Sequence, residues 1–200
     1  MDPLVIALTF GAIFLVELPD KTFIATLVLS TKFRPLLVWI GVGLAFLVQT
    51  LIAVALGKVI AQLPIDWVRL GAAAMFLTGA VLLFREARGA DAAEGDTEEE
   101  FAARAGTPKA GFAAIGASFL VLFAAEWGDL SQLLTLSLVA KYDDPVSVFL
   151  GAWGALLAVS GLAVVLGRVL LSRMRLSTLH YVGSGVCLLL FGITVWEIVG

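Results

Sequence analysis

Long apolar stretches alternate with short polar breaks along this chain. Several stretches reach the ~20 residues that an α-helix needs to cross a bilayer. The breaks carry proline or charged residues, as between Lys32 and Pro35 and between Lys141 and Pro145. The pattern predicts six membrane-spanning helices, at residues 4–30, 36–61, 67–86, 111–140, 146–171 and 177–199. We therefore expect an all-α integral membrane protein.

The composition strengthens this expectation. Of the 200 residues, 60% are hydrophobic and 14% are charged, whereas a soluble domain carries about 25% charged residues. The first apolar stretch follows Met1-Asp2-Pro3 without a basic region, which predicts a retained helix and not a cleaved signal peptide. Cys187 is the only cysteine, so the chain forms no intramolecular disulfide and no thiolate cluster for a soft metal.

Residues 88–110 differ from the rest because Asp and Glu are concentrated there among Ala and Gly. This composition cannot bury a core, so we expect a mobile linker between two membrane domains, 1–87 and 111–200. The linker could also concentrate cations at the membrane face. With the N-terminus outside, nine Lys and Arg residues fall in inner loops and three in outer loops. This bias predicts outer termini and a cytoplasmic acidic loop. The compact chain without a targeting segment predicts a bacterial plasma membrane as the location.

The two halves of the sequence repeat. Adding 109 to the residue number maps Glu17 to Glu126 and Asp20 to Asp129, and one inserted residue shifts the later offset to 110. Further matched pairs are Thr9 and Ser118, Thr22 and Ser131, Gly41 and Gly151, and Thr50 and Ser160. Each half has three predicted spans, an odd number, so the second copy enters from the opposite side. The predicted fold is two inverted three-helix repeats, as in many secondary transporters, whose sites lie near the midplane.

Two short acidic motifs interrupt the first span of each half. They are Glu17-Leu18-Pro19-Asp20-Lys21-Thr22 and Glu126-Trp127-Gly128-Asp129-Leu130-Ser131. In each, Glu and Asp are three residues apart and share a helix face, and a helix breaker precedes the Asp. A carboxylate at the centre of a membrane helix costs roughly 2.5–3.5 kcal/mol on insertion scales, so four of them indicate a site for positive charge.

The motifs offer only oxygen ligands. These are the carboxylates of Glu17, Asp20, Glu126 and Asp129, with Thr22, Ser131 and Gln132 as neutral helpers. Hard cations such as Mn²⁺, Ca²⁺ and Mg²⁺ prefer such ligands, and Mn²⁺ and Ca²⁺ lose water more readily than Mg²⁺. Clustered buried acids hold protons until a metal displaces them, which predicts cation/proton exchange at one shared site. Lys21, matched by Leu130, either neutralises one carboxylate or holds the site when it is empty.

Both motifs resemble the paired Glu-φ-Gly-Asp-(Lys/Arg)-(Thr/Ser) signatures of the Gdt-type cation/proton exchangers, also called uncharacterised protein family sixteen, of the lysine-exporter superfamily. The resemblance covers the whole chain and implies exchange of Mn²⁺ or Ca²⁺ for H⁺, with the four carboxylates as ligands and no resident cofactor. Bacterial members are similar to manganese exporters. Pro19 stands where the signature has Gly, and Leu130 where it has Lys or Arg. The second departure leaves the ion preference and the proton-to-metal ratio open.

Other functions remain open from the residues. An intramembrane aspartyl protease could use Asp20 and Asp129 as a dyad, but it would not need the matched glutamates. An exporter of a small organic cation would need a larger apolar pocket, and a passive channel would not need protonation-linked acids. The acids could also act only as staples between helices. We favour a transporter, not an enzyme, that exports Mn²⁺, with Ca²⁺ possible, in a lipid bilayer and without nucleic acid, as a monomer or homodimer.

The sequence also predicts the surroundings of four further polar or aromatic residues. Gln49 should hydrogen-bond between helices. His180 should lie at the membrane interface and not act as a proton relay, Glu86 should reach water near a helix end, and Trp127 could form a wall of the cation site.

Overall fold

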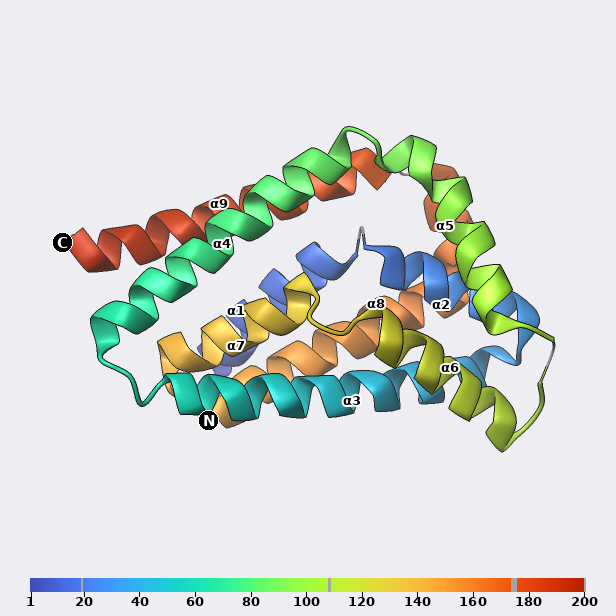
Figure 1. Ribbon diagram of the computed structural model, residues 1–200, viewed down its shortest axis with the longest axis horizontal. Coiled ribbons are helices and arrows are strands. Elements are labelled where there is room, and N and C mark those ends of the chain that lie inside the picture. Colours follow the sequence, from blue (N-terminus) through green and yellow to red (C-terminus); the bar gives the residue numbers. More distant parts are fainter. Residues whose placement is uncertain (19, 108, 174–175, 200) are drawn as a thin grey trace.

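The computed structural model describes residues 1–200 except residues 19, 108, 174, 175 and 200, and except the side chains at 65, 90–95, 166–173, 176, 179 and 197. The described part is all-helical, which confirms the predicted fold class (Figure 1). Its helices are α1 (Pro3–Glu17), α2 (Lys21–Lys32), α3 (Pro35–Ile60), α4 (Ile65–Ala87), α5 (Ala90–Ala105), α6 (Phe112–Ala125), α7 (Leu130–Tyr142), α8 (Pro145–Arg173) and α9 (Leu176–Val199).

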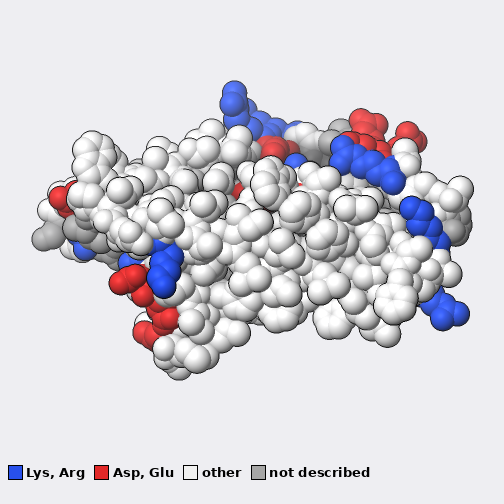
Figure 2. Space-filling view, turned by 60° about the horizontal axis from the view of Figure 1, so that its bottom comes forward, with Lys and Arg blue, Asp and Glu red and all other residues white. Residues whose placement is uncertain are grey.

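Three helices, α3, α4 and α8, are long and apolar enough to cross a membrane. Two bent pairs, α1 with α2 and α6 with α7, each pass the same test when taken as one span, which gives up to five spans by length and composition. In α9 the described apolar stretch His180–Trp196 is shorter. One face of the molecule has Lys, Arg, Asp and Glu near its edges and a broad uncharged surface between them (Figure 2). The structure therefore supports a membrane protein, while the division into six spans stays a prediction.

The two acidic motifs coincide with the two breaks. Helices α1 and α2 are bent by 72° and helices α6 and α7 by 73°. Asp20 and Asp129 are the N-cap residues of α2 and α7: the Asp20 carboxylate accepts from the Lys21 N–H, and the Asp129 carboxylate accepts from the Ser131 N–H. Gly128 has a positive φ of 78°, a conformation that favours glycine. Pro19, the breaker expected in the first motif, lies outside the described residues.

The halves of the chain interlock through close helix contacts. Helix α3 packs against α6 and α7, and α8 packs against α1 and α2, while α4 and α9 pair with each other (Figure 1). A Cβ atom at Gly41 of α3 would overlap the Ile115 carbonyl oxygen and the Ser118 side chain of α6. A Cβ atom at Gly151 of α8 would come within 2.8 Å of Thr9 Cβ in α1. The matched glycines therefore make matched contacts, which supports the predicted repeat.

The acidic segment contains a helix, unlike the mobile linker that we expected. Helix α5 packs against α2, and Phe101 and Ala105 are buried in the main hydrophobic core. The Lys32 ammonium at the end of α2 donates to the Ala102 and Gly106 carbonyl oxygens, near the end of α5. The sequence from Ala90 to Ala105 is rich in Ala and Glu, which are good helix formers. Composition hid this helix because, among its described residues, few apolar positions anchor it: Phe101, Ala102 and Ala105.

Phe101→Ala is expected to release α5 from the rest of the molecule. The substitution removes a buried ring, which costs about 3 kcal/mol in a well-packed core. Hydrogen exchange measured by mass spectrometry should become faster in residues 96–105 and stay unchanged in α3. Phe112→Ala is the matched control because the Phe112 side chain is exposed. Unchanged exchange in α5 of the Phe101→Ala variant would show that the helix does not depend on this anchor.

Candidate cation site

The two breaks present the same pair of acids in the same way. Glu17 is the last residue of α1, and Glu126 follows the last residue of α6. Asp20 and Asp129 stand directly before α2 and α7. Each motif therefore places a glutamate at the end of one half-helix and an aspartate at the start of the next. Without the breaks, these side chains would remain on the surface of a continuous helix.

The structure brings the four carboxylates together. Glu17, Asp20, Glu126 and Asp129 each offer an oxygen atom, and these oxygens all lie within 4.8 Å of one another. We call these four carboxylates the acidic cluster. The Glu17 and Glu126 side chains are buried, with 0% and 2% exposed, and the two aspartates are half-buried. Residues 109 positions apart in the sequence thus meet at one place, as the repeat predicted.

Several polar atoms of the site have no protein partner. Both carboxylate oxygens of Glu17 and of Glu126, and the Thr22 hydroxyl, are buried and make no hydrogen bond with the described residues. Burying such groups without partners is costly, and most so for ionised ones. Protons or a cation would supply the missing interactions. The site therefore has the chemistry of a place where a positive species binds.

The neutral helper residues occupy different positions. Thr22 is buried beside the Glu17 and Glu126 carboxylates, and Ser131 is buried beside Glu17. The Gln132 side-chain oxygen accepts a hydrogen bond from the Gly128 N–H at 2.9 Å, so it stabilises the bend before α7. Trp127 is 61% exposed and its ring is tilted beside that of Phe123, while its expected place as a wall of the cation site stays a prediction.

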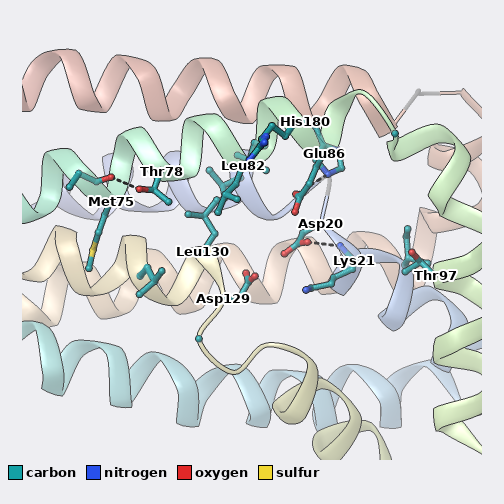
Figure 3. A pocket seen from close by; sticks show the side chains of 18 residues that line it. Asp20, Lys21, Met75, Thr78, Leu82, Glu86, Thr97, Asp129, Leu130 and His180 are labelled. Atoms are coloured by element: carbon teal, nitrogen blue, oxygen red, sulfur yellow. Dashed lines mark hydrogen bonds and ion pairs between the residues drawn. The ribbon is translucent and has the colours of Figure 1, made fainter.

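A cavity of about 630 Å³ reaches the aspartate side of the cluster (Figure 3). Asp20, Lys21 and Asp129 line it, together with residues of α4, including Met75, Thr78, Leu82 and Glu86, and His180 of α9. Neither glutamate of the cluster is among its lining residues. The aspartates therefore stand between the cavity and the deeper glutamates. Such an arrangement gives ions a route into the cluster.

Sequence reasoning missed the role of α4 and α9 as cavity walls. His180 is 5% exposed and its Nε2 lies 3.8 Å from a Glu86 carboxylate oxygen, so it is buried between helices; its place at the membrane interface stays a prediction. Glu86 is exposed as expected, and its side chain enters the cavity. Gln49 donates to the Phe123 carbonyl oxygen at 3.1 Å, which confirms its role between α3 and α6. No local motif marks Glu86 or His180, because they meet only through the packing of α4 on α9.

The chain is similar to proteins of one family. The family described as divalent cation/proton antiporter GDT1 matches residues 5–91 and 114–198. A GDT1-like protein of Synechocystis is 29% identical over 188 residues, which are 90% of each chain. A protein of Vibrio cholerae named "Putative manganese exporter" is 30% identical over 93% of this chain and 88% of its own. PAM71 of Arabidopsis thaliana, a chloroplastic protein, is 30% identical over 96% of this chain but 57% of its own. No solved structure matches.

Apolar helices, two broken pairs and a buried carboxylate cluster define a membrane transporter of cations, not an enzyme. The family match covers both acidic motifs and leaves out residues 92–113, which include most of α5. The chain belongs to the GDT1 family of divalent cation/proton antiporters.

Proposed function

We propose that this protein exports Mn²⁺ from the cytoplasm in exchange for protons, with Ca²⁺ as a second substrate. The observation that carries the proposal is the acidic cluster, in which four carboxylates from the two halves converge and both glutamates are buried without partners. The manganese in the name of the Vibrio cholerae relative favours Mn²⁺. Membership of the GDT1 family removes the protease alternative.

The compactness of the cluster suits one shared cation. One oxygen from each of the four carboxylates lies within 4.8 Å of the other three, so a single ion can contact all four residues. Ca²⁺ accepts six to eight oxygen ligands in flexible geometry, whereas Mg²⁺ requires near-ideal octahedral geometry and retains several waters, so a cage of protein carboxylates favours the larger ion. Thr22 and Ser131 act on the Glu17 carboxylate and are the neutral oxygens nearest in role to such a shell. Carboxylate and hydroxyl oxygens also suit Mn²⁺.

Proton coupling follows from the charge of the cluster. Four carboxylates in a small buried volume repel one another, and a divalent cation relieves this repulsion. When the cation leaves, protons are the other species that can neutralise the same oxygens. The cation and the protons therefore compete for one set of atoms, and this competition couples their movement in opposite directions.

The position of the cavity supports alternating access. Its wall extends from Met75 in the middle of α4 to Gly89 and Thr97, beside and within α5. If α5 is cytoplasmic, as the distribution of basic residues predicts, the cavity leads from the cytoplasm to the acidic cluster. In the proposed cycle the two halves rearrange around the cluster and open it to the opposite side, where both termini lie.

The test uses purified protein in liposomes. Mn²⁺ uptake should be driven by an outward-directed proton gradient and should fall to the level of empty liposomes when an ionophore collapses the gradient. Ca²⁺ should move in the same assay, more slowly than Mn²⁺. Flux that is independent of the proton gradient would indicate a passive channel. Absence of flux for both ions with folded protein, together with flux of an organic cation, would favour the organic-cation exporter.

A further inference from the structure

Lys21 is the one cationic residue of the two acidic motifs, and its side chain is exposed to the cavity. Its ammonium group lies in the electrostatic field of Asp20, Asp129, Glu126 and Glu86. Among the described residues, however, it makes no ion pair within 4.0 Å. Lys21 therefore lies beside the acidic cluster without forming a close ion pair with any one of its carboxylates.

Glu86 stands apart from the cluster in the same cavity. Figure 3 shows Asp20 and Asp129 converging beside Lys21, with Glu86 beyond Asp20 and His180 next to Glu86. The Glu86 side chain is 58% exposed, and its oxygen lies 3.8 Å from the buried His180 Nε2. Lys21 is thus acted on by two sets of negative charge: the acidic cluster at the two helix breaks, and Glu86 on α4. A flexible ammonium of this kind can pair with either set.

The second half of the chain has no equivalent cation. Leu130 occupies the position that matches Lys21, and its methyl carbons lie 2.8 and 3.4 Å from the place where a Cβ atom of Gly79 would be. Arg85 also lines the cavity, but it belongs to α4 and not to either acidic motif. Lys21 is the basic residue whose charge acts on the Glu17 and Glu126 carboxylates.

We infer that Lys21 is a tethered competitor of the transported cation: it pairs with the aspartates of the empty cluster and moves to Glu86 when a divalent cation binds. The inference rests on the proposed function, because it assumes that the cluster binds the cation. The ammonium is displaced by the cation and returns when the cation leaves. Glu86 acts through Lys21 by accepting the displaced charge, and His180 holds Glu86 in the cavity.

A lysine that competes in this way lowers the affinity of the acidic cluster for the transported cation. The tethered positive charge of Lys21 repels the incoming cation, so it weakens binding and speeds release. Its withdrawal to Glu86 reduces the repulsion while the cation is bound. An exporter benefits because a cluster of four free carboxylates would hold the cation too tightly to release it. The lysine therefore increases turnover at the expense of affinity.

The experiment is a double-mutant cycle on Mn²⁺ binding at one pH, measured on purified full-length protein by the electron paramagnetic resonance signal of free Mn²⁺. Lys21→Gln should tighten Mn²⁺ binding by about tenfold and slow the flux in liposomes. Glu86→Gln alone should weaken binding about threefold, because Lys21 then remains at the cluster. In the double variant the effect of Glu86→Gln should disappear. Lys21→Arg should keep the affinity of the wild type.

The cycle distinguishes displacement of Lys21 from direct attraction of the cation by Glu86. If Glu86→Gln weakens binding equally with and without Lys21, Glu86 attracts the cation directly and the inference fails. If Lys21→Gln leaves binding unchanged or weaker, it also fails. Lys58→Gln, at an exposed position near the end of α3 and outside the cavity lining, controls for the total charge of the protein and should leave the affinity unchanged. An effect equal to that of Lys21→Gln would overturn a specific role for the lysine. If the wild type binds no Mn²⁺ or Ca²⁺, the proposed function itself fails.

The reverse substitution tests the same idea in the second half of the cluster. Leu130→Lys adds a second tethered cation at the matched position and should weaken Mn²⁺ binding by about tenfold. Leu130→Met keeps an apolar side chain of similar size and is the control. Equal binding by the lysine and methionine variants would show that a cation at this position does not compete.

Discussion

Glu17→Gln and Glu126→Gln are each expected to abolish proton-coupled cation transport and to weaken cation binding by about 100-fold or more. Both glutamates are buried in the acidic cluster, and none of their oxygens has a hydrogen-bond partner among the described residues. The amide keeps the shape of the side chain but removes a negative charge and the ability to exchange a proton. Binding should be measured as free Mn²⁺, and transport as Mn²⁺ uptake into liposomes.

The stability of these variants separates a cation site from a structural staple. If the glutamates bind a transported cation, removing one of several buried acids relieves repulsion, so the variants should unfold at the same temperature or higher. If they hold helices together, the variants should unfold at a lower temperature and should lose transport only in proportion to the loss of folded protein. Glu99→Gln, at an exposed position of α5, is the control for a lost charge.

Substitutions at Asp20 and Asp129 can remove a negative charge while keeping the helix cap. Asp20 and Asp129 cap α2 and α7, and asparagine is as good a helix cap as aspartate. Asp20→Asn and Asp129→Asn should therefore keep both helix starts and still weaken cation binding. A normal affinity in both variants would restrict the site to the two glutamates.

The meeting of the four carboxylates was predictable because three local signals agree. Acidic residues in apolar spans are costly, helix breakers sit beside them, and the same motif recurs after 109 residues. An odd number of spans in each half then predicts that the motifs face each other. The helix breakers in the two motifs also predict that α1 and α6 end there. The local motifs and the overall topology therefore both predict that the four carboxylates meet.

The cavity and the helix in the acidic segment were not predictable in the same way. Glu86 and His180 belong to α4 and α9, and their contact depends on how these two helices pack. Helix α5 depends on Phe101 and Ala105, two apolar residues among many acidic ones. The amide of Gln132 satisfies a backbone N–H beside Gly128, a need that arises only because the chain bends there. The first two features result from packing between segments that share no sequence motif, and the third results from a bend whose geometry the motif does not specify.

The matched glycines Gly41 and Gly151 allow the halves of the chain to pack closely. Gly41→Ala and Gly151→Ala should each lower the stability by about 2–3 kcal/mol, a decrease of roughly 5–10 °C in the unfolding temperature. An added methyl group at Gly151 would lie 2.6 Å from the Ile6 carbonyl oxygen, so α8 must move away from α1. At Gly41 the methyl group would lie 2.9 Å from Ser118 Cβ, so α3 must move away from α6. Unfolding of the detergent-solubilised protein, followed by tryptophan fluorescence, measures both.

Gly116→Ala provides the matched control, because no atom lies within 4 Å of the added methyl group. Alanine is favoured over glycine inside a helix by up to about 1 kcal/mol, so this variant should be slightly more stable than the wild type. A loss of stability at Gly41 and Gly151 together with a gain at Gly116 would show that close helix contact, and not helix propensity, decides the change in stability. Similar losses at Gly41 and Gly151 would support equivalent roles in the two repeats. A loss at only one of them would contradict the pseudo-twofold arrangement on which alternating access around the acidic cluster depends.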